Sequence, residues 1–143
     1  MKLQTKFFGE IEIEESGIIE FVRPLLAFEN HRKFVLLDGM DDLVFTFLQS
    51  IDEPQLCFLT VPPAMLVSDY DIEIGDEVVK LLGLNSPADV LLFNIVNVPE
   101  NVEDMTVNMK APIVVNYKNK KAAQEVLNDD KYEVKYRIQK AGE

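Results

Sequence analysis

Carboxylates are the residues whose number and spacing could do chemistry in this chain. Between Phe34 and Val79 the sequence holds ten of them and neither lysine nor arginine. They are Asp38, Asp41, Asp42, Asp52, Glu53, Asp69, Asp71, Glu73, Asp76 and Glu77. A folded segment with charges of one sign makes a negative face, which attracts basic partners and repels nucleic acid. The alternative interpretation is a solvated acidic face that serves solubility alone.

The spacing Asp69-x-Asp71-x-Glu73 is also that of the first ligands in a calcium-binding loop. Ile74 stands where such a loop needs glycine, and Lys80 occupies the position of the bidentate carboxylate, so we expect no calcium site. On a β-strand the same spacing would place the three carboxylates on one face and the apolar residues between them on the other. That face is either a solvated outer surface or a docking surface for lysine and arginine.

Other catalytic groups are scarce. His31 is the only histidine, and its polar surroundings predict a surface position. Cys57, the only cysteine, lies among apolar neighbours, which favours a buried, unreactive thiol. The sequence has no nucleophile elbow and no phosphate-binding loop. A hydrolase with paired carboxylates would need two of them about 5 to 10 Å apart in a pocket, and the spacing does not favour one. We therefore expect no enzyme, cofactor or metal.

The charge balance narrows the choice of partners. The net charge is −11 over 143 residues, and eight of the fourteen basic residues lie in the last thirty-four positions. Such a balance disfavours direct binding to RNA or DNA. At 48% hydrophobic residues the chain can bury a core, and we expect a single domain over residues 1–143. The sequence shows no signal peptide and no apolar run long enough to cross a membrane, which predicts a cytoplasmic protein.

The elements that must position these residues are mostly strands. Alternating or short apolar runs bounded by turn residues predict strands over 9–15, 18–21, 34–37, 43–49, 56–61, 90–98, 113–115 and 132–138, and another at Val107. Asp76 and Glu77 begin a short helix that Gly83 ends. Residues 122–127 fit a helix or a strand. The predicted fold class is all-β, with one short helix, as a small antiparallel β-barrel or sandwich.

Four sequence motifs resemble those of the flagellar assembly factor FliW, and the likeness extends from about residue 7 to 138. They are Phe45-x-Phe47-Leu48-Gln49-Ser50, Phe58-x-x-Val61-x-Pro63, Asp69-Tyr70 and Thr106-Val107-Asn108-Met109-Lys110-Ala111-Pro112-Ile113, which Asn116, Gln124 and Tyr132 follow. The last is the most specific of the four.

The chain departs from the family in one loop. Where the family usually reads Phe-Pro-x-Gly-Leu-Pro-Gly-Phe, this chain reads Phe21-Val22-Arg23-Pro24-Leu25-Leu26-Ala27-Phe28. Glycine permits a positive φ angle, and we expect that Pro24 and Ala27 do not adopt one.

The resemblance implies a non-enzymatic regulator that binds flagellin and the RNA-binding translational repressor CsrA, and so relieves repression of flagellin translation. The alternative is a dedicated cytoplasmic flagellin chaperone without a role in RNA regulation, which would need an exposed apolar groove. Asn108 in the family motif also fits a structural role in a turn. The candidate partner-binding residues are Asp41, Asp42, Phe45, Phe47, Asp52, Glu53, Asp69, Tyr70, Asp71 and Asn108.

Overall fold

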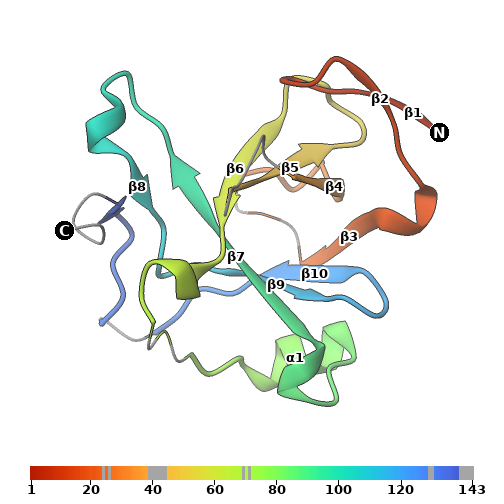
Figure 1. The fold of residues 1–143 in the computed structure, drawn as a ribbon. Coiled ribbons are helices and arrows are strands. Elements are labelled where there is room, and N and C mark those ends of the chain that lie inside the picture. Colours follow the sequence, from red (N-terminus) through yellow and green to blue (C-terminus); the bar gives the residue numbers. More distant parts are fainter. Residues whose placement is uncertain are drawn as a thin grey trace.

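The structure, a computed structural model, describes residues 1–23, 25, 27–38, 45–68, 70, 72–128 and 131–138. Its strands are β1 (Lys2–Gln4), β2 (Glu10–Glu12), β3 (Ile18–Arg23), β4 (Lys33–Asp38), β5 (Thr46–Ser50), β6 (Cys57–Val61), β7 (Val90–Asn97), β8 (Thr106–Val107), β9 (Ile113–Asn116), β10 (Lys121–Gln124) and β11 (Tyr136–Arg137) (Figure 1). The helix α1 spans Asp76–Leu82, and short 3-10 turns cover η1 (Glu15–Gly17), η2 (Pro63–Met65), η3 (Pro87–Asp89) and η4 (Val102–Asp104).

Seven of these strands close into a barrel. The order β3, β4, β5, β6, β7, β9, β10 returns to β3, and every pair is antiparallel except β3 with β10, which run parallel. Strand β7 pairs with three strands along its length. Its first half pairs with β9, Asn94 and Ile95 pair with β6, and Val96 and Asn97 pair with β8. The predicted barrel is thus confirmed, with one parallel pair that the sequence did not indicate.

The barrel interior is filled by apolar side chains from five strands. Fully or almost fully buried members are Ile19, Phe21, Phe34, Leu48, Ile113, Val115 and Ala122. The rings of Phe21 and Phe34, on neighbouring strands, meet edge to face with centroids 5.4 Å apart. Burial of each such side chain contributes about 1.5–3 kcal/mol, so this centre fixes the strands that carry the surface loops.

A second layer covers the outside of the barrel near β4. The hairpin of β1 and β2 places Leu3 and Ile13 against Val35, and all three are buried. Gly9, at a φ angle of +67°, lies in the connection between the two strands, where the Thr5 amide donates to the Gly9 carbonyl at 2.9 Å. A positive φ is a conformation that glycine adopts without steric cost. The hairpin tip is therefore closed by its own hydrogen bond, and the hairpin packs on the barrel through Leu3 and Ile13.

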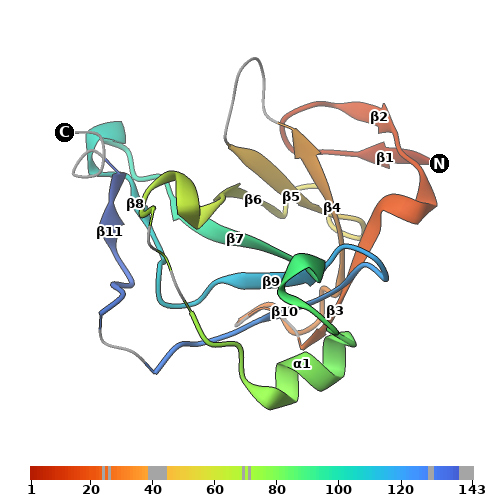
Figure 2. The same ribbon diagram turned by 60° about the horizontal axis from the view of Figure 1, so that its bottom comes forward.

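Helix α1 closes the opposite side of the barrel, as Figure 2 shows. It begins with Asp76 and Glu77 in its first turn and ends at Gly83, whose φ of +67° makes a left-handed cap. Val78 and Leu82 are buried against Val114 and Ala123 of β9 and β10. The helix predicted from its acidic start and terminal glycine is confirmed. No helix among the described residues is long and apolar enough to cross a membrane.

Several expectations about local structure were wrong. The predicted strand over 132–138 is reduced to β11, Tyr136–Arg137, because the two-residue strand β8 is its only partner strand in the described part of the chain. His31 is partly buried rather than at the surface. Ala27 does adopt a positive φ, of +71°, so the loop keeps a backbone that glycine would favour. Strand β1 was not predicted. In the ambiguous segment, residues 122–124 belong to β10 (Lys121–Gln124), because β3 and β9 pair with it on both sides, and residues 125–127 belong to no helix or strand.

Candidate partner-binding surface

Strand β5 and its flanking residues carry four of the sequence-predicted site residues. Phe47 is half-buried on the face of β5 opposite Leu48, whose side chain belongs to the barrel interior. Phe45 precedes the strand and packs against a core outside the barrel. Asp52 and Glu53 lie exposed in the turn that follows β5. The strand thus joins an aromatic ring on the outer surface to two carboxylates at its end.

Two further aromatic residues, which the sequence did not identify, meet Phe47. The Phe7 ring centroid lies 5.4 Å from that of Phe47, and the Phe8 centroid lies 5.2 Å from it, edge to face. The Phe7 side chain is 57% exposed although its ring packs against that of Phe47. We call Phe7, Phe8 and Phe47 the aromatic cluster. Exposed aromatic groups of this kind are typical anchors of protein interfaces.

Gln49 fixes the position of the acidic turn relative to the aromatic cluster. Its side chain is fully buried, and its Oε1 accepts a hydrogen bond from the Lys6 amide at 3.0 Å. Its Nε2 donates to the carbonyls of Pro54 at 3.1 Å and Leu56 at 3.3 Å. One side chain therefore ties the residue before Phe7 to the turn that holds Asp52 and Glu53.

The Ser50 side chain at the end of β5 also stabilises this turn. Its Oγ accepts hydrogen bonds from the amides of Asp52 at 3.2 Å and Glu53 at 3.0 Å. Among the described residues, no ion pair within 4.0 Å involves either carboxylate. The nearby cation Lys6 lies over the Phe7 ring, 5.3 Å from its centroid. Neither carboxylate is thus paired with a described cation, and Glu53 Oε1 accepts a hydrogen bond from the Gln55 amide at 3.1 Å.

Cys57 lies beside this surface but offers no reactive thiolate. It pairs with Gln49 across the sheet and is partly buried. Burial raises the pKa of its thiol to about 11, and the positive charge of Lys6 opposes that rise. A thiol with so high a pKa is a poor nucleophile.

Tyr70 and Asn108 belong to a separate polar group, which Asn94 of β7 connects. The Tyr70 hydroxyl donates to the Met109 carbonyl at 2.8 Å, and burial raises its pKa, opposed by a hydrogen bond with Asn94. Asn94 also donates to the Asn108 carbonyl at 2.8 Å. The Asn108 side-chain oxygen accepts from the amides of Lys110 and Ala111, each at 3.1 Å. These polar atoms hold the family motif in its turn.

The base-free span does not make one continuous acidic face. Asp38 ends β4 beside the start of β5, whereas Asp52 and Glu53 follow the end of β5, so they lie at opposite ends of that strand. Glu73 and Asp76 lie near α1, on the other side of the barrel (Figure 1). The expectation of a single face was wrong, because successive strands carry the chain from one end of the barrel to the other. Asp41, Asp42, Asp69 and Asp71 lie outside the described residues.

The predicted carboxylate ladder at 69–73 is also absent from the described part of that segment. Tyr70 and residues 72–75 belong to no strand, because no neighbouring strand pairs with them. The predicted alternation persists: Ile72 and Ile74 pack against cores, and Glu73 is exposed. The described residues contain no group of three or more histidine, cysteine or carboxylate side chains placed to hold a metal ion.

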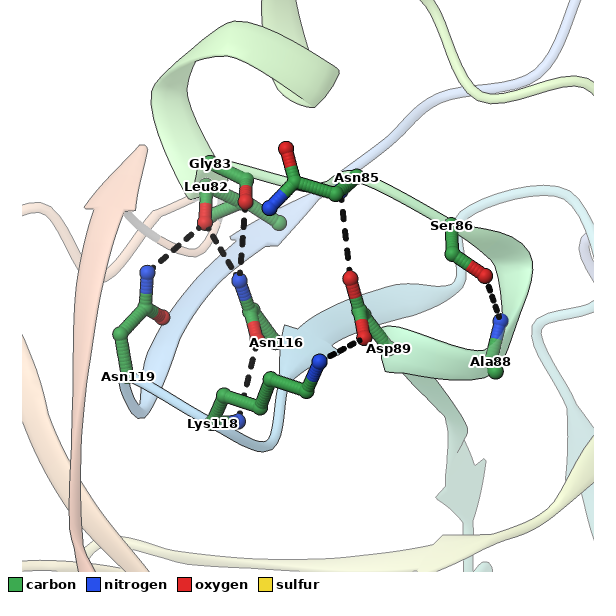
Figure 3. Close-up of polar contacts among 9 residues, drawn as sticks. All are labelled: Leu82, Gly83, Asn85, Ser86, Ala88, Asp89, Asn116, Lys118 and Asn119. Carbon is green, nitrogen blue, oxygen red and sulfur yellow. Dashed lines mark hydrogen bonds and ion pairs between the residues drawn. The ribbon is translucent and has the colours of Figure 1, made fainter.

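A polar network anchors the end of α1 to the barrel (Figure 3). Asn116 donates to the Leu82 carbonyl at 2.7 Å, and Asn119 donates to the same oxygen at 2.9 Å. Asp89 is almost fully buried and pairs with the Lys118 ammonium at 2.8 Å. That pairing, together with the Asn85 amide, holds the pKa of the Asp89 carboxyl below its usual range. The family-motif residue Asn116 therefore has a structural role here.

Two grooves flank the irregular segment formed by Tyr70 and residues 72–75, which we call the strap. The helix-side groove, of about 560 Å³, separates the strap from α1 and the start of β7. Its lining includes Ile74, Val79, Leu84, Val90 and Leu92. The tail-side groove, of about 620 Å³, lies between the strap and residues 125–128.

The amino-acid sequence matches the family model described as "FliW protein" over residues 2–138. Proteins described as "Flagellar assembly factor FliW" are similar along nearly the whole chain. The relative from Ruminiclostridium cellulolyticum is 39% identical over 139 residues, covering 96% of this chain and 94% of that protein. The relative from Clostridium novyi is 37% identical over 142 residues, covering 99% of each.

The relative from Treponema denticola is 38% identical over 138 residues, covering 96% of this chain and 93% of that protein. A solved structure is also similar. The crystal structure of a flagellar assembly factor FliW superposes on this chain with a TM-score of 0.89 at 33% sequence identity, covering 96% of each chain. The family model, the sequence relatives and the solved structure all indicate the same family, and the chain belongs to the FliW family of flagellar assembly factors.

Proposed function

We propose that this protein binds flagellin and the RNA-binding translational repressor CsrA, and that it relieves repression of flagellin translation by holding CsrA. Its family is one of flagellar assembly factors, and a role in flagellum assembly is the background of the proposal. Neither role requires catalysis. The net charge of −11 disfavours a direct contact between this protein and messenger RNA, so regulation has to act through the repressor.

The aromatic cluster beside Asp52 and Glu53 is the observation that carries the proposal. A protein that binds RNA presents basic surface, and carboxylates on a rigid turn attract such a surface. The Gln49 hydrogen bonds link the acidic turn to the residue before Phe7, so the carboxylates and the exposed ring are held on connected segments that one partner can contact. Carboxylates increase the association rate, whereas a buried aromatic anchor supplies affinity.

This arrangement also gives a mechanism for releasing RNA. An acidic body docked beside the RNA-binding surface of CsrA raises the electrostatic energy of an incoming phosphate backbone. The acidic protein need not cover the RNA site itself, because charges are felt across a Debye length of about 8 Å at physiological salt. The repressor bound to this protein therefore releases the flagellin messenger.

The test is an RNA-release titration. Purified protein is added to a complex of CsrA with the flagellin leader RNA, and bound RNA is followed by fluorescence anisotropy. We expect wild type to release the RNA and a variant with Phe7→Ala, Asp52→Asn and Glu53→Gln to release less at equal concentration. Met65→Ala, which removes a side chain 59% exposed elsewhere, is the matched control. RNA that stays bound at excess wild-type protein contradicts the proposal.

A dedicated flagellin chaperone without a role in RNA regulation is the second candidate. The apolar lining of the helix-side groove favours it, because amphipathic ends of flagellin need such a groove. This candidate predicts binding to flagellin and none to CsrA, so the same titration separates the two functions.

A further inference from the structure

The strap combines fixed ends with an exposed middle. At one end the Tyr70 hydroxyl binds the Met109 carbonyl at 2.8 Å, and at the other the Gly75 amide donates to Glu125 Oε2 at 3.2 Å. Between them Ile72 and Ile74 face inward and Glu73 faces solvent. The described residues of this segment form a ridge between the two grooves.

The two grooves differ in chemistry. Apolar side chains dominate the helix-side groove, with Leu84, Val90 and Leu92 only partly covered. The tail-side groove carries the carboxylates of Asp76 and Glu125, together with the half-exposed Val126. The strap residues Ile72, Glu73 and Ile74 line both grooves. A mainly apolar wall at α1 and β7 and an acidic wall at Asp76 and Glu125 therefore lie on opposite sides of the strap.

The described residues that line the two grooves include neither lysine nor arginine. Cations beside the grooves include Arg23, which pairs with Glu77 at 2.9 Å and reaches Glu125 at 3.9 Å, and Lys131, which lies over the Tyr132 ring. Another is Lys110, whose carbonyl accepts a hydrogen bond from the Leu127 amide at 2.8 Å. Among the described residues no ion pair involves Glu73 or Asp76. The negative charges of Glu73 and Asp76 at the tail-side groove are thus not paired with a described cation.

We propose that an amphipathic peptide segment docks across the strap, with apolar side chains in the helix-side groove and lysine or arginine side chains in the tail-side groove. The complementary charge of the tail-side groove selects a basic polar face, and the apolar groove selects the opposite face. Within the proposed function, on which this assignment rests, the occupant is an amphipathic terminal segment of flagellin. The site is distinct from the aromatic cluster, whose residues belong to β5 and to the connection between β1 and β2. Figure 2 shows the β1–β2 hairpin on the side of the barrel away from α1.

Two synthetic peptides of identical apolar face provide the test, one with lysines and one with glutamates on its polar face. Binding to the full-length protein is measured by fluorescence anisotropy, and the site is located by amide chemical shifts. We expect the lysine peptide to bind at least tenfold more tightly and to shift the amides of Ile72, Ile74 and Leu92. Equal binding of the two peptides, or shifts confined to other surfaces, would overturn the assignment.

Two charge variants and two matched controls sharpen the test. Glu73→Lys places a cation on the strap between the two grooves, and Val126→Lys places one in the tail-side groove. Each variant should weaken binding of the lysine peptide at least tenfold. Glu100→Lys and Val98→Lys change exposed residues in another loop, with Val98 and Val126 both 51% exposed, and should leave binding unchanged. If the control variants weaken binding of the lysine peptide as much as the groove variants do, the groove assignment is also overturned.

Full-length flagellin separates this inference from the proposed function. If wild type binds the lysine peptide in the grooves but does not bind flagellin, the flagellin part of the proposed function fails and the groove assignment stands. If flagellin binds wild type, Glu73→Lys and Val126→Lys with equal affinity, the proposed function stands and flagellin as the occupant of these grooves is refuted.

Discussion

The side-chain oxygen of Gln49 and the amide of Lys6 share a hydrogen bond of 3.0 Å across 43 positions of sequence. This bond joins the tip of the β1–β2 hairpin to strand β5, and with it an exposed aromatic ring to an acidic turn. A buried amide with every polar atom satisfied rigidifies its surroundings, because any loosened contact leaves an unpaired polar group. The proposed partner surface therefore depends on a residue that no partner touches.

Gln49→Ala should destabilise the fold. The substitution removes hydrogen bonds to Lys6, Pro54 and Leu56 and leaves buried groups without partners, a loss of about 2–4 kcal/mol in the free energy of unfolding. Urea denaturation measures it. Gln55→Ala, at an exposed glutamine in the adjacent turn, should change stability by less than about 0.5 kcal/mol. Equal stability of wild type and Gln49→Ala would refute the role assigned to this side chain.

Phe7→Ala should weaken CsrA binding about tenfold with little change in the association rate. The ring is 57% exposed, so its loss costs little folding energy, whereas a buried interface anchor contributes more than about 1 kcal/mol to binding. Surface plasmon resonance resolves the two rates, and Met65→Ala is the control. Dissociation rates that are the same for Phe7→Ala and wild type would exclude the ring from the interface.

Ala27→Gly should stabilise the protein by about 1 kcal/mol. Ala27 adopts a φ of +71°, and a left-handed backbone costs about 1–2 kcal/mol for a residue with a Cβ atom. Part of that gain is offset by the greater freedom of glycine in the unfolded chain. Ala64→Gly, at an exposed alanine without a positive φ, should instead lower stability. Thermal unfolding of both variants provides the comparison, and a lower Tm for Ala27→Gly contradicts the expectation.

The Asp89 carboxylate should make stability depend on acid pH. Its pairing with Lys118 lowers its pKa in the folded state, so its contribution is present above the ordinary carboxyl pKa of about 3.9. That contribution is lost as pH falls through the lowered folded pKa. Asp89→Asn should therefore be less stable than wild type at pH 7, with the difference shrinking below about pH 4. Urea unfolding at a series of pH values measures this difference, with Glu100→Gln as control; a constant difference contradicts it.

Local signals in the sequence predicted the parts of the fold that depend on local interactions. Helix α1 was predicted because Asp76, Glu77 and Gly83 are its own start and end signals. The strand at 132–138 was overpredicted, because alternation alone does not provide a partner strand. Strand β10 remained ambiguous because its pairing with β3 and β9 is long-range in sequence. Pairing between distant segments has no local signature.

The candidate surface was predictable only in part for the same reason. Phe47, Asp52 and Glu53 follow from the alternation and turn of β5. Phe7 reaches Phe47 only because the hairpin folds over the barrel, so the sequence gives no sign of the contact. The prediction of a single acidic face was wrong, because residues that are close in sequence lie at opposite ends of the barrel when a strand separates them. The single-domain assignment stays a prediction.

The association rate of CsrA, measured by stopped flow at low and physiological salt, tests the central claim most directly. A variant with Asp52→Asn and Glu53→Gln should associate about threefold to tenfold more slowly than wild type at low salt, with a shallower salt dependence. A variant with Glu14→Gln and Glu15→Gln, of equal net charge and altered at exposed positions elsewhere, should behave as wild type. If both variants associate at the same rate with the same salt dependence, the acidic turn does not guide CsrA and the account fails.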